Sequence, residues 1–382
     1  MPTRDLLNLC NDLVVTTTAR QLPPGQPPRN RLGWIDAAKG LCMALVVLWH
    51  VSLWYQNEIN TTGQLSIWYS LGEFFAPVRM PLFFFISGLL VTSALQRTLG
   101  QTRTKTLGIY YLYVLWTTLF LCRLFLPFQS DHPPTVRDLV ISALLPASFW
   151  YLWALPAFFL FTWAVRRVFG ARGIYFAIPL AILSALSPWI EDATRPLLEE
   201  PLDALKLGSV ASNLVWYFCG AYLRDVCLSR MGSASTAKAR AGVLMYTVCT
   251  VGALLLGVEE EVKVLIAPIA LWAALQVFGT ANVASSLGRS LQWIGRQTLP
   301  VYIFHIFAIS VLSAAVKISG LDEVLRANAL LWATLLPPVL AAGIIVSARL
   351  LGQGILASPA RWLLQAPPLL VKSTTHGRHG RG

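Results

Sequence analysis

The sequence predicts an all-α protein, a polytopic transmembrane helix bundle of about ten spans with both termini in the cytoplasm. Three observations predict this fold: an apolar composition, a series of long apolar runs, and an uneven distribution of basic residues. Of the 382 residues, 55% are hydrophobic and 13% are charged, whereas a soluble protein carries roughly twice that share of charge. The composition excludes an ordinary cytosolic enzyme and a disordered chain.

The apolar runs supply the helices, since several exceed the roughly 18 residues that a bilayer-spanning helix needs. In chain order the predicted spans are residues 34–54, 67–95, 107–128, 139–165, 173–190, 208–226, 241–258, 262–283, 298–317 and 328–352. The second and fourth are longer than one span requires, so we expect each to include a break or an interfacial stretch.

The 30 Lys and Arg residues set the orientation of these spans. With the amino terminus in the cytoplasm, the inner segments and span ends hold 21 of them and the outer loops hold six. The other three, Lys39, Arg79 and Arg123, fall within spans. Because basic residues accumulate on the cytoplasmic side of membrane proteins, both termini are predicted to lie inside. The same bias explains the net charge of +12 without a nucleic-acid partner.

The predicted organisation is a flexible cytoplasmic arm at residues 1–30, a membrane domain at 31–355 and a basic cytoplasmic tail at 356–382. The arm is rich in proline, and we expect no cleaved signal peptide ahead of the first span. The basic tail end fits either contact with anionic lipid or simple solvation. The six scattered cysteines lack the spacing of metal ligands, so no metal site is expected.

Ionisable side chains within the spans are the candidate site residues, because a charge at membrane depth costs a few kcal/mol on insertion scales. In the first span, Lys39 and His50 are separated by three helical turns plus about 20°, so they share one face, about 16 Å apart along the axis. Asp36, one turn before Lys39, is close enough to pair with it. A pair that only neutralises two charges near the interface explains these residues equally well.

His50 is the sharpest of these candidates, because the apolar run at residues 41–49 offers it no local partner. A neutral buried histidine is suited to take a proton from a hydroxyl, and the alternative is a core histidine hydrogen-bonded for packing. Glu73, near the outer start of the second span, is a candidate orienter by depth. His305 in the ninth span is a second intramembrane histidine, with either a site role or a structural one.

The second span continues with Arg79 and Pro81 and ends its aromatic run at Ser87-Gly88. Pro81 frees a backbone carbonyl, Gly88 permits close helix contact, and a kink here can open space for a ligand. Arg79 fits a site for an anionic group and an ion pair with Glu73 equally well.

In order along the chain, these residues form a pattern that resembles the acyltransferase 3 family of integral membrane O-acyltransferases. Lys39, ten residues ahead of His50, is similar to the first-helix signature of that family. Arg103 and Lys105 stand where the family places a basic pair, with the spacing Arg-x-Lys instead of Arg-x-x-Arg. Further similar motifs are Phe83-Phe84-Phe85-Ile86-Ser87-Gly88, Trp150-Tyr151-Leu152-Trp153, Phe218-Cys219-Gly220, and the segment from Gly295 through Thr298 and Tyr302 to His305, in which Thr298 replaces the usual Ser. The resemblance runs from about Arg31 to the tenth span.

The resemblance implies transfer of an acyl group, usually acetyl, from cytoplasmic acyl-CoA to a hydroxyl of a sugar, polysaccharide or lipid-linked acceptor of the cell envelope. It implies an enzyme of the bacterial inner membrane that binds no cofactor and takes acetyl-CoA or another acyl-CoA as donor substrate. On this reading the candidate catalytic residues are His50, Asp36, Glu73 and His305. The candidate substrate-binding residues are Lys39, Arg79, Ser87, Arg103, Lys105 and Tyr302, with Ser87, Tyr302 or Arg79 stabilising the oxyanion.

A secondary transporter or flippase of a polar or glycolipid solute is the competing class, because ten spans, broken helices and buried charges also describe carriers. Carriers commonly show paired repeats with matching interrupted helices, and here Pro81 and Pro156 do not fall in halves that superpose. A scaffold without chemistry leaves both intramembrane histidines unexplained.

Overall fold

The computed structural model describes residues 33–60, 66–122, 135–194, 205–282 and 284–371. The predicted arm, Arg123 and the basic end of the tail lie outside these residues. All regular secondary structure in the described part of the chain is helical, which confirms the all-α prediction. The α-helices are α1 (Gly33–Trp54), α2 (Ile67–Phe74), α3 (Ala76–Val91), α4 (Leu107–Cys122), α5 (Val136–Leu144), α6 (Trp150–Phe169), α7 (Ala177–Ala185), α8 (Ser187–Thr194), α9 (Leu207–Tyr222), α10 (Arg224–Gly232), α11 (Thr236–Leu256), α12 (Glu259–Thr280), α13 (Ser286–Gly295), α14 (Thr298–Ser319), α15 (Leu321–Ala327), α16 (Ala329–Ala357) and α17 (Pro368–Val371).

Six helical segments of the described chain are long and apolar enough to cross a membrane, and counting the bent pair α2 and α3 as one span gives seven. This makes the protein an integral, multi-pass membrane protein. The remaining predicted spans correspond to the shorter helices α4 and α9 and to a division of the single segment Trp150–Ala185. The total of about ten spans therefore stays a prediction.

Both of the long predicted spans contain a break. The first break lies at Phe75, where α2 and α3 meet at a bend of 49°. Pro77 follows in the first turn of α3, where its missing N–H costs no helical hydrogen bond. The kink was expected at Pro81, but that residue lies inside the continuous α3. The second break separates α5 from α6.

A glycine pair sets the crossing of α1 over α13, the most extensive contact between two helices of the bundle. A Cβ added to Gly40 would lie 1.9 Å from the carbonyl oxygen of Leu291, and one added to Gly295 would lie 1.8 Å from that of Asp36. The two backbones therefore touch directly, as in small-residue packing of membrane helices.

A second glycine pair sets the crossing of α3 over α9. A Cβ on Gly88 would lie 2.0 Å from the carbonyl oxygen of Tyr217, and one on Gly220 would lie 2.1 Å from that of Phe85. The expectation that Ser87-Gly88 permits close helix contact is confirmed. Its partner is the glycine of the Phe218-Cys219-Gly220 motif, so one helix crossing explains two of the motifs found in the sequence.

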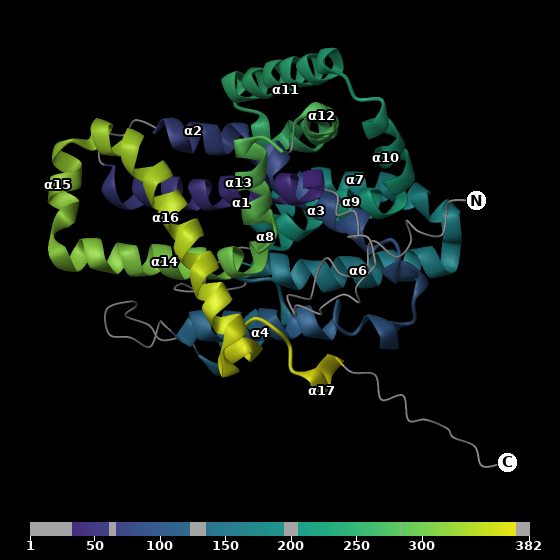
Figure 1. The fold of residues 1–382 in the computed structure, drawn as a ribbon, viewed down its shortest axis with the longest axis horizontal. Helices are drawn as coiled ribbons and strands as arrows, with labels where there is room; N and C mark the ends of the chain where they lie inside the picture. Colours follow the sequence, from purple (N-terminus) through teal and green to yellow (C-terminus); the bar gives the residue numbers. More distant parts are fainter. Residues whose placement is uncertain (1–32, 61–65, 123–134, 195–204, 283, 372–382) are drawn as a thin grey trace.

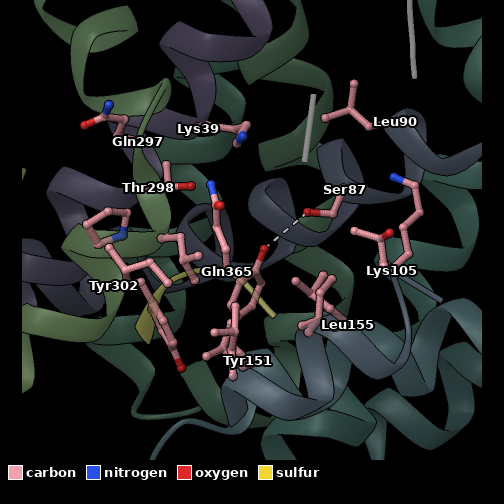
Figure 2. Close-up of a pocket in the computed structure, with 18 of the residues that line it drawn as sticks. Lys39, Ser87, Leu90, Lys105, Tyr151, Leu155, Gln297, Thr298, Tyr302 and Gln365 are labelled. Atoms are coloured by element: carbon pink, nitrogen blue, oxygen red, sulfur yellow. Dashed lines mark hydrogen bonds between the residues drawn. The ribbon is translucent and has the colours of Figure 1, made fainter. Parts of the chain in front are cut away.

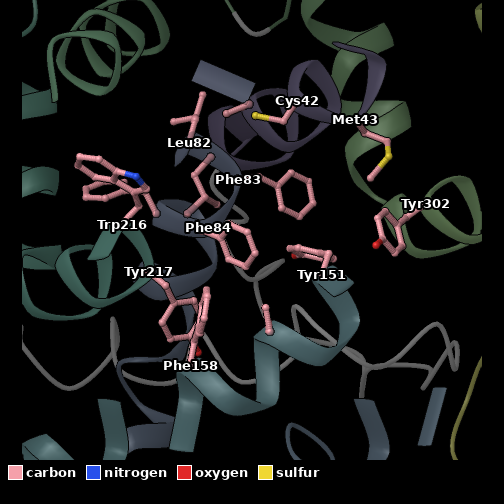
Figure 3. Packing of buried hydrophobic residues seen from close by; sticks show 14 of the residues in the cluster. Cys42, Met43, Leu82, Phe83, Phe84, Tyr151, Phe158, Trp216, Tyr217 and Tyr302 are labelled. Carbon is pink, nitrogen blue, oxygen red and sulfur yellow. The ribbon is translucent and has the colours of Figure 1, made fainter. Parts of the chain in front are cut away.

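Aromatic side chains fill the space between α3, α6 and α9. Phe84 packs against Tyr151 and Phe158 with ring centroids 5.0 and 5.1 Å apart, and Phe158 packs against Tyr217 at 5.7 Å (Figure 3). Large apolar side chains on the outer helices are instead exposed: Leu255, Leu256, Ile318, Leu330 and Val339 are each at least 67% exposed. Apolar outer surfaces of this kind face lipid in a membrane protein.

Segments predicted to share a side of the membrane meet at one end of the bundle. At the predicted outer end, Glu58 after α1 pairs with Lys317 of α14 at 2.9 Å, and Tyr55 donates to the carbonyl of Ala329 at the start of α16. Trp68 of α2 donates to the carbonyl of Thr334. The basic-residue count remains the reason for assigning this end to the outside.

The packed bundle extends beyond the predicted domain boundary at residue 355. After α16 the chain turns through residues 358–367 to α17, and Figure 1 shows α17 near α4, at the edge opposite α11 and α12. Trp116 of α4 donates to the carbonyl of Leu363 at 2.7 Å. The first part of the predicted tail is thus packed against the membrane domain.

Candidate active site

Two cavities share one lining residue, Tyr302, near the start of α14. One cavity, of about 330 Å³, is lined by Lys39, Ser87, Lys105, Tyr151 and Arg296 among others, and we call it the inner cavity after the predicted orientation. The other, of about 250 Å³, is lined by His50, Arg79, Asn213, Lys263 and His305 among others, and we call it the outer cavity. Tyr302 is the only described residue that lines both. Most polar residues of each cavity come from span halves predicted to lie on its own side of the membrane. Tyr302 and His305 are exceptions, because they line the outer cavity from the inner half of the ninth predicted span.

The two intramembrane histidines come together in the outer cavity. The rings of His50 in α1 and His305 in α14 pack edge to face, with centroids 5.0 Å apart and an interplanar angle of 68°. His305 is fully buried, while His50 is partly exposed. Sequence reasoning required a partner for His50 on another helix, and one partner is the second histidine.

Backbone hydrogen bonds select the same tautomer for both rings. Nδ1 of His50 lies 2.8 Å from the carbonyl oxygen of Val46, and Nδ1 of His305 lies 3.1 Å from that of Val301. A carbonyl oxygen only accepts, so each Nδ1 carries the hydrogen and each neutral ring keeps its lone pair on Nε2. Nε2 of His305 is buried and has no hydrogen-bond partner among the described residues.

A chain of ring contacts connects the histidines to the inner cavity. His305 packs on Tyr302 with ring centroids 5.9 Å apart, and Tyr302 packs on Tyr151 at 5.2 Å. The hydroxyl of Tyr151 lies 3.4 Å from that of Ser87, the contact drawn in Figure 2. Four predicted site residues, His50, His305, Tyr302 and Ser87, therefore form one continuous path across the junction of the cavities.

The inner cavity collects basic side chains from three separate segments. Lys39 comes from α1, Lys105 from the turn before α4, and Arg296 from the turn before α14 (Figure 2 shows the first two). Arg103, two residues before Lys105, does not line the cavity. Residues 364–366 and Val371 close its edge, so the segment after α16 forms part of the wall.

Asp36 belongs to this inner rim. Its carboxylate is buried, with 1% of the residue exposed, and lies 3.7 Å from Nε of Arg296, whose side chain is half exposed. At 1.5 Å per residue, Asp36 is about 21 Å from His50 along α1. The distance separates Asp36 from the histidine pair and associates it with the basic rim.

Arg79 lies beside the histidines, on the wall of the outer cavity. Its guanidinium stacks over Trp49 at 4.9 Å from the ring centroid and donates to the carbonyl of Gly72 at 3.2 Å. The charge of Glu73 acts on it electrostatically. The structure thus brings Arg79 to the cavity with a carboxylate nearby, and the role of Glu73 as an orienter of His50 stays a prediction.

The sequence analysis missed several residues of the cavity walls, among them Tyr151, Asn213, Arg296 and Gln365. Tyr151 and Arg296 were noted only as members of motifs. Asn213 is an amide within the apolar α9. An uncharged polar side chain at membrane depth is therefore the signal in the sequence that points to it. Among the described residues, no group of three or more His, Cys, Asp or Glu is placed to hold a metal ion.

Residues 32–350 match an acyltransferase domain, the family named acyltransferase 3. The chain is also similar to the inner membrane protein YcfT of Escherichia coli (strain K12), with 24% identity over 380 residues that cover 90% of this chain and 98% of YcfT. No solved structure matches the chain.

Proposed function

The chain belongs to the acyltransferase 3 family, and from this premise we propose that it transfers an acyl group, first of all acetyl, from acyl-CoA in the inner cavity to a hydroxyl in the outer cavity. The acceptor is a sugar or another hydroxyl-bearing component of the cell envelope. The observation that carries the proposal is the junction at Tyr302, with a basic rim on one side and two Nε2 lone pairs on the other.

The inner cavity suits the donor. Coenzyme A has phosphate charges at one end of a long arm and the thioester at the other, which matches a cationic mouth leading to a base at depth. Lys39, Lys105 and Arg296 supply the cations, and Lys39 lies about 16 Å from His50 along the helix axis. The thioester then reaches Tyr302 while the phosphates stay at the rim.

His50 is the proposed general base. Its Nε2 takes the proton from the acceptor hydroxyl as the oxygen attacks the thioester carbonyl, which becomes a tetrahedral oxyanion. The oxyanion collapses, the carbon–sulfur bond breaks, and the proton passes from His50 to the leaving sulfur. The products are the acyl ester of the acceptor and free CoA thiol, and His50 is neutral again.

Tyr302 is the donor best placed to stabilise the oxyanion, because it faces both cavities. Ser87 is less suited, since its hydroxyl already donates to the carbonyl of Phe83 at 2.8 Å. Arg79 lines only the outer cavity, where it contributes positive charge beside the acceptor.

His305 and Asp36 act on other side chains in this scheme. The neutral ring of His305, packed edge to face on that of His50, stabilises through its dipole the imidazolium that His50 becomes during the reaction. Asp36 holds Arg296 at the donor rim. A membrane location for the reaction follows from the fold, and the similarity to an inner membrane protein of E. coli supports the bacterial inner membrane.

The proposal is tested with detergent-purified protein and acetyl-CoA labelled in the acetyl group. Label is expected in an envelope glycan extract, in a form that mild alkali releases, as for an O-ester. Succinyl-CoA, supplied in place of acetyl-CoA, tests a second acyl group. A transporter or flippase would instead transfer no label from either donor, and the same protein in vesicles would move an envelope glycolipid without consuming acyl-CoA.

A further inference from the structure

Part of the wall of the outer cavity is built from small polar side chains of α7, α8 and α9. They are Ser184, Ser187, Ser209, Ser212 and Asn213, and we call them the α9 wall. Hydroxyl and amide groups both donate and accept, so the question is which of these capacities remains for a ligand.

The hydrogens of Asn213 are already used. Its Nδ2 donates to the carbonyl of Ser209 at 2.8 Å and to Oγ of Ser212 at 2.9 Å, and these are the two hydrogens that an amide has. The carbonyl partner fixes which amide atom is the nitrogen, since that oxygen only accepts. Oδ1 of Asn213 is buried without a hydrogen-bond partner among the described residues, although only 6% of the residue is exposed.

The hydroxyl hydrogens of two neighbouring serines are also used. The hydroxyl of Ser212 donates to the carbonyl of Ser209 at 3.0 Å, and that of Ser184 donates to the carbonyl of Ser212 at 2.9 Å. Across the cavity, both histidines donate through Nδ1 to their own helices. The acceptors that these residues of the cavity lining hold are therefore serine oxygens, Oδ1 of Asn213 and Nε2 of His305.

A buried acceptor without a partner costs about 1–3 kcal/mol, so such a wall is matched to a ligand that brings several hydrogens. Hydroxyl and ammonium groups both bring them. The charge of the cavity decides between the two, because Arg79 and Lys263 line it and none of its described lining residues is Asp or Glu. An ammonium group would find no carboxylate partner among these lining residues, which leaves a compound with several hydroxyls.

The size and the remaining surface of the cavity agree with a single ring. Its volume of about 250 Å³ is just below the range of about 300–1,000 Å³ typical of ligand pockets. The side chains of Trp49, Trp150 and Trp216 complete the walls. Indole faces pack against the apolar C–H face of a polyhydroxylated ring while its edge hydroxyls reach acceptors.

We propose that Asn213 is a specificity-determining residue that selects, for the acyl transfer proposed above, an acceptor ring with at least two hydroxyls and no positive charge. One hydroxyl donates to Nε2 of His50 and is acylated. A second hydroxyl donates to Oδ1 of Asn213 and orients the ring. The inference rests on the proposed function for the identity of the first hydroxyl, whereas the binding preference stands on the α9 wall itself.

The test uses one ring size with different substituents. Cyclohexanol, trans-1,2-cyclohexanediol, myo-inositol and 2-aminocyclohexanol are titrated into the detergent-purified full chain, and affinity is measured by calorimetry. The same compounds are then supplied as acyl acceptors with acetyl-CoA. We expect the diol and inositol to bind tighter than cyclohexanol by about three- to tenfold for each additional hydroxyl that donates to the wall, which is the contribution of one neutral hydrogen bond. The amine should bind most weakly.

The variant Asn213→Leu removes Oδ1, and we expect it to bind the diol no better than cyclohexanol while its affinity for acetyl-CoA is unchanged. Gln276→Leu is the matched control, because Gln276 is also a buried amide with an unpartnered oxygen but lines neither cavity. It should retain the full preference for the diol. If Asn213→Leu does not fold, Ser212→Ala removes an acceptor oxygen from the same wall with a smaller change in volume.

Equal affinities of wild type for cyclohexanol and the diol would overturn the inference, as would a preference that persists in folded Asn213→Leu. Failure of the proposed function looks different. In that case the hydroxyl preference and its dependence on Asn213 are present in the calorimetry, but no acetyl-CoA is consumed with any acceptor.

Discussion

The imidazole of His305 lies edge to face against that of His50, with ring centroids 5.0 Å apart, although the two residues are far apart in the sequence, in α14 and α1. His305 leaves its Nε2 buried without a partner among the described residues. A phenylalanine would fill such a position without that cost. A histidine at this position therefore indicates a functional role, and we propose that His305 stabilises the imidazolium of His50.

The first prediction replaces His305 by phenylalanine. The variant His305→Phe should raise the free energy of unfolding by about 1 kcal/mol, because it removes a buried unsatisfied group, and lower kcat by about ten- to a hundredfold. Thermal unfolding and acetyl-CoA turnover of the purified variant check both parts. A more stable His305→Phe protein with wild-type kcat would show that His305 serves packing alone.

The second prediction concerns the hydroxyl of Tyr302. Removing one oxyanion donor costs about 10²- to 10³-fold in kcat, so Tyr302→Phe should lose that much with little change in the KM for acetyl-CoA. Tyr113→Phe is the matched control, because Tyr113 is fully buried, donates to the carbonyls of Ser142 and Leu145, and lines neither cavity. It should lower stability by about 1 kcal/mol and leave kcat unchanged. Equal turnover by the two variants would contradict the role of Tyr302 as the oxyanion donor.

The third prediction separates two basic residues that the sequence pattern placed together. Lys105 lines the inner cavity and Arg103 does not. Lys105→Ala should therefore raise the KM for acetyl-CoA about tenfold, the size of a lost bond to a charged group, while Arg103→Ala changes it less than twofold. S-acetylpantetheine lacks the nucleotide phosphates, so with this donor the two variants should behave alike. A larger increase in KM for Arg103→Ala than for Lys105→Ala would contradict the binding of the phosphates in the inner cavity.

The fourth prediction tests the glycine crossing of α1 and α13. Gly40→Ala places a Cβ 1.9 Å from the carbonyl oxygen of Leu291, so the two helices must separate, at a cost of about 1–3 kcal/mol or more. Gly343→Ala, in α16 with nothing within 4 Å of its Cβ position, should be neutral or stabilise by up to about 1 kcal/mol. The melting temperatures of the two variants in detergent give the comparison. Equal melting temperatures would contradict the close crossing.

Much of this arrangement follows from local features of the sequence. The spacing of Lys39 and His50 predicted that they share one helical face, about 16 Å apart along the axis, and in the structure Lys39 lines the inner cavity and His50 the outer one. The breaks in the two long spans were expected from length alone. The first break was predicted at Pro81 but lies at Phe75. A proline is accommodated within a membrane helix when neighbouring helices support the freed backbone group. Phe75 is not a residue type that would indicate a break.

Pairings between distant segments were beyond the sequence. That Gly40 meets Gly295, or that His50 meets His305, depends on the three-dimensional crossing of helices, and one sequence has no signal for it. Asn213 was missed for a different reason, since an amide in an apolar helix is inexpensive enough to pass as packing. It becomes a candidate only in the structure, where both hydrogens of its amide are used and its Oδ1 is buried without a partner among the described residues.

The most direct test of the account is thiol release from acetyl-CoA by purified wild type, His50→Ala and the control Gln276→Leu, with and without an envelope glycan extract. We predict that wild type and Gln276→Leu release thiol only when the extract is present, and that His50→Ala is slower by about 10²- to 10⁴-fold, the usual contribution of a general base. A His50→Ala protein with the melting temperature and the thiol release rate of wild type would contradict the central claim.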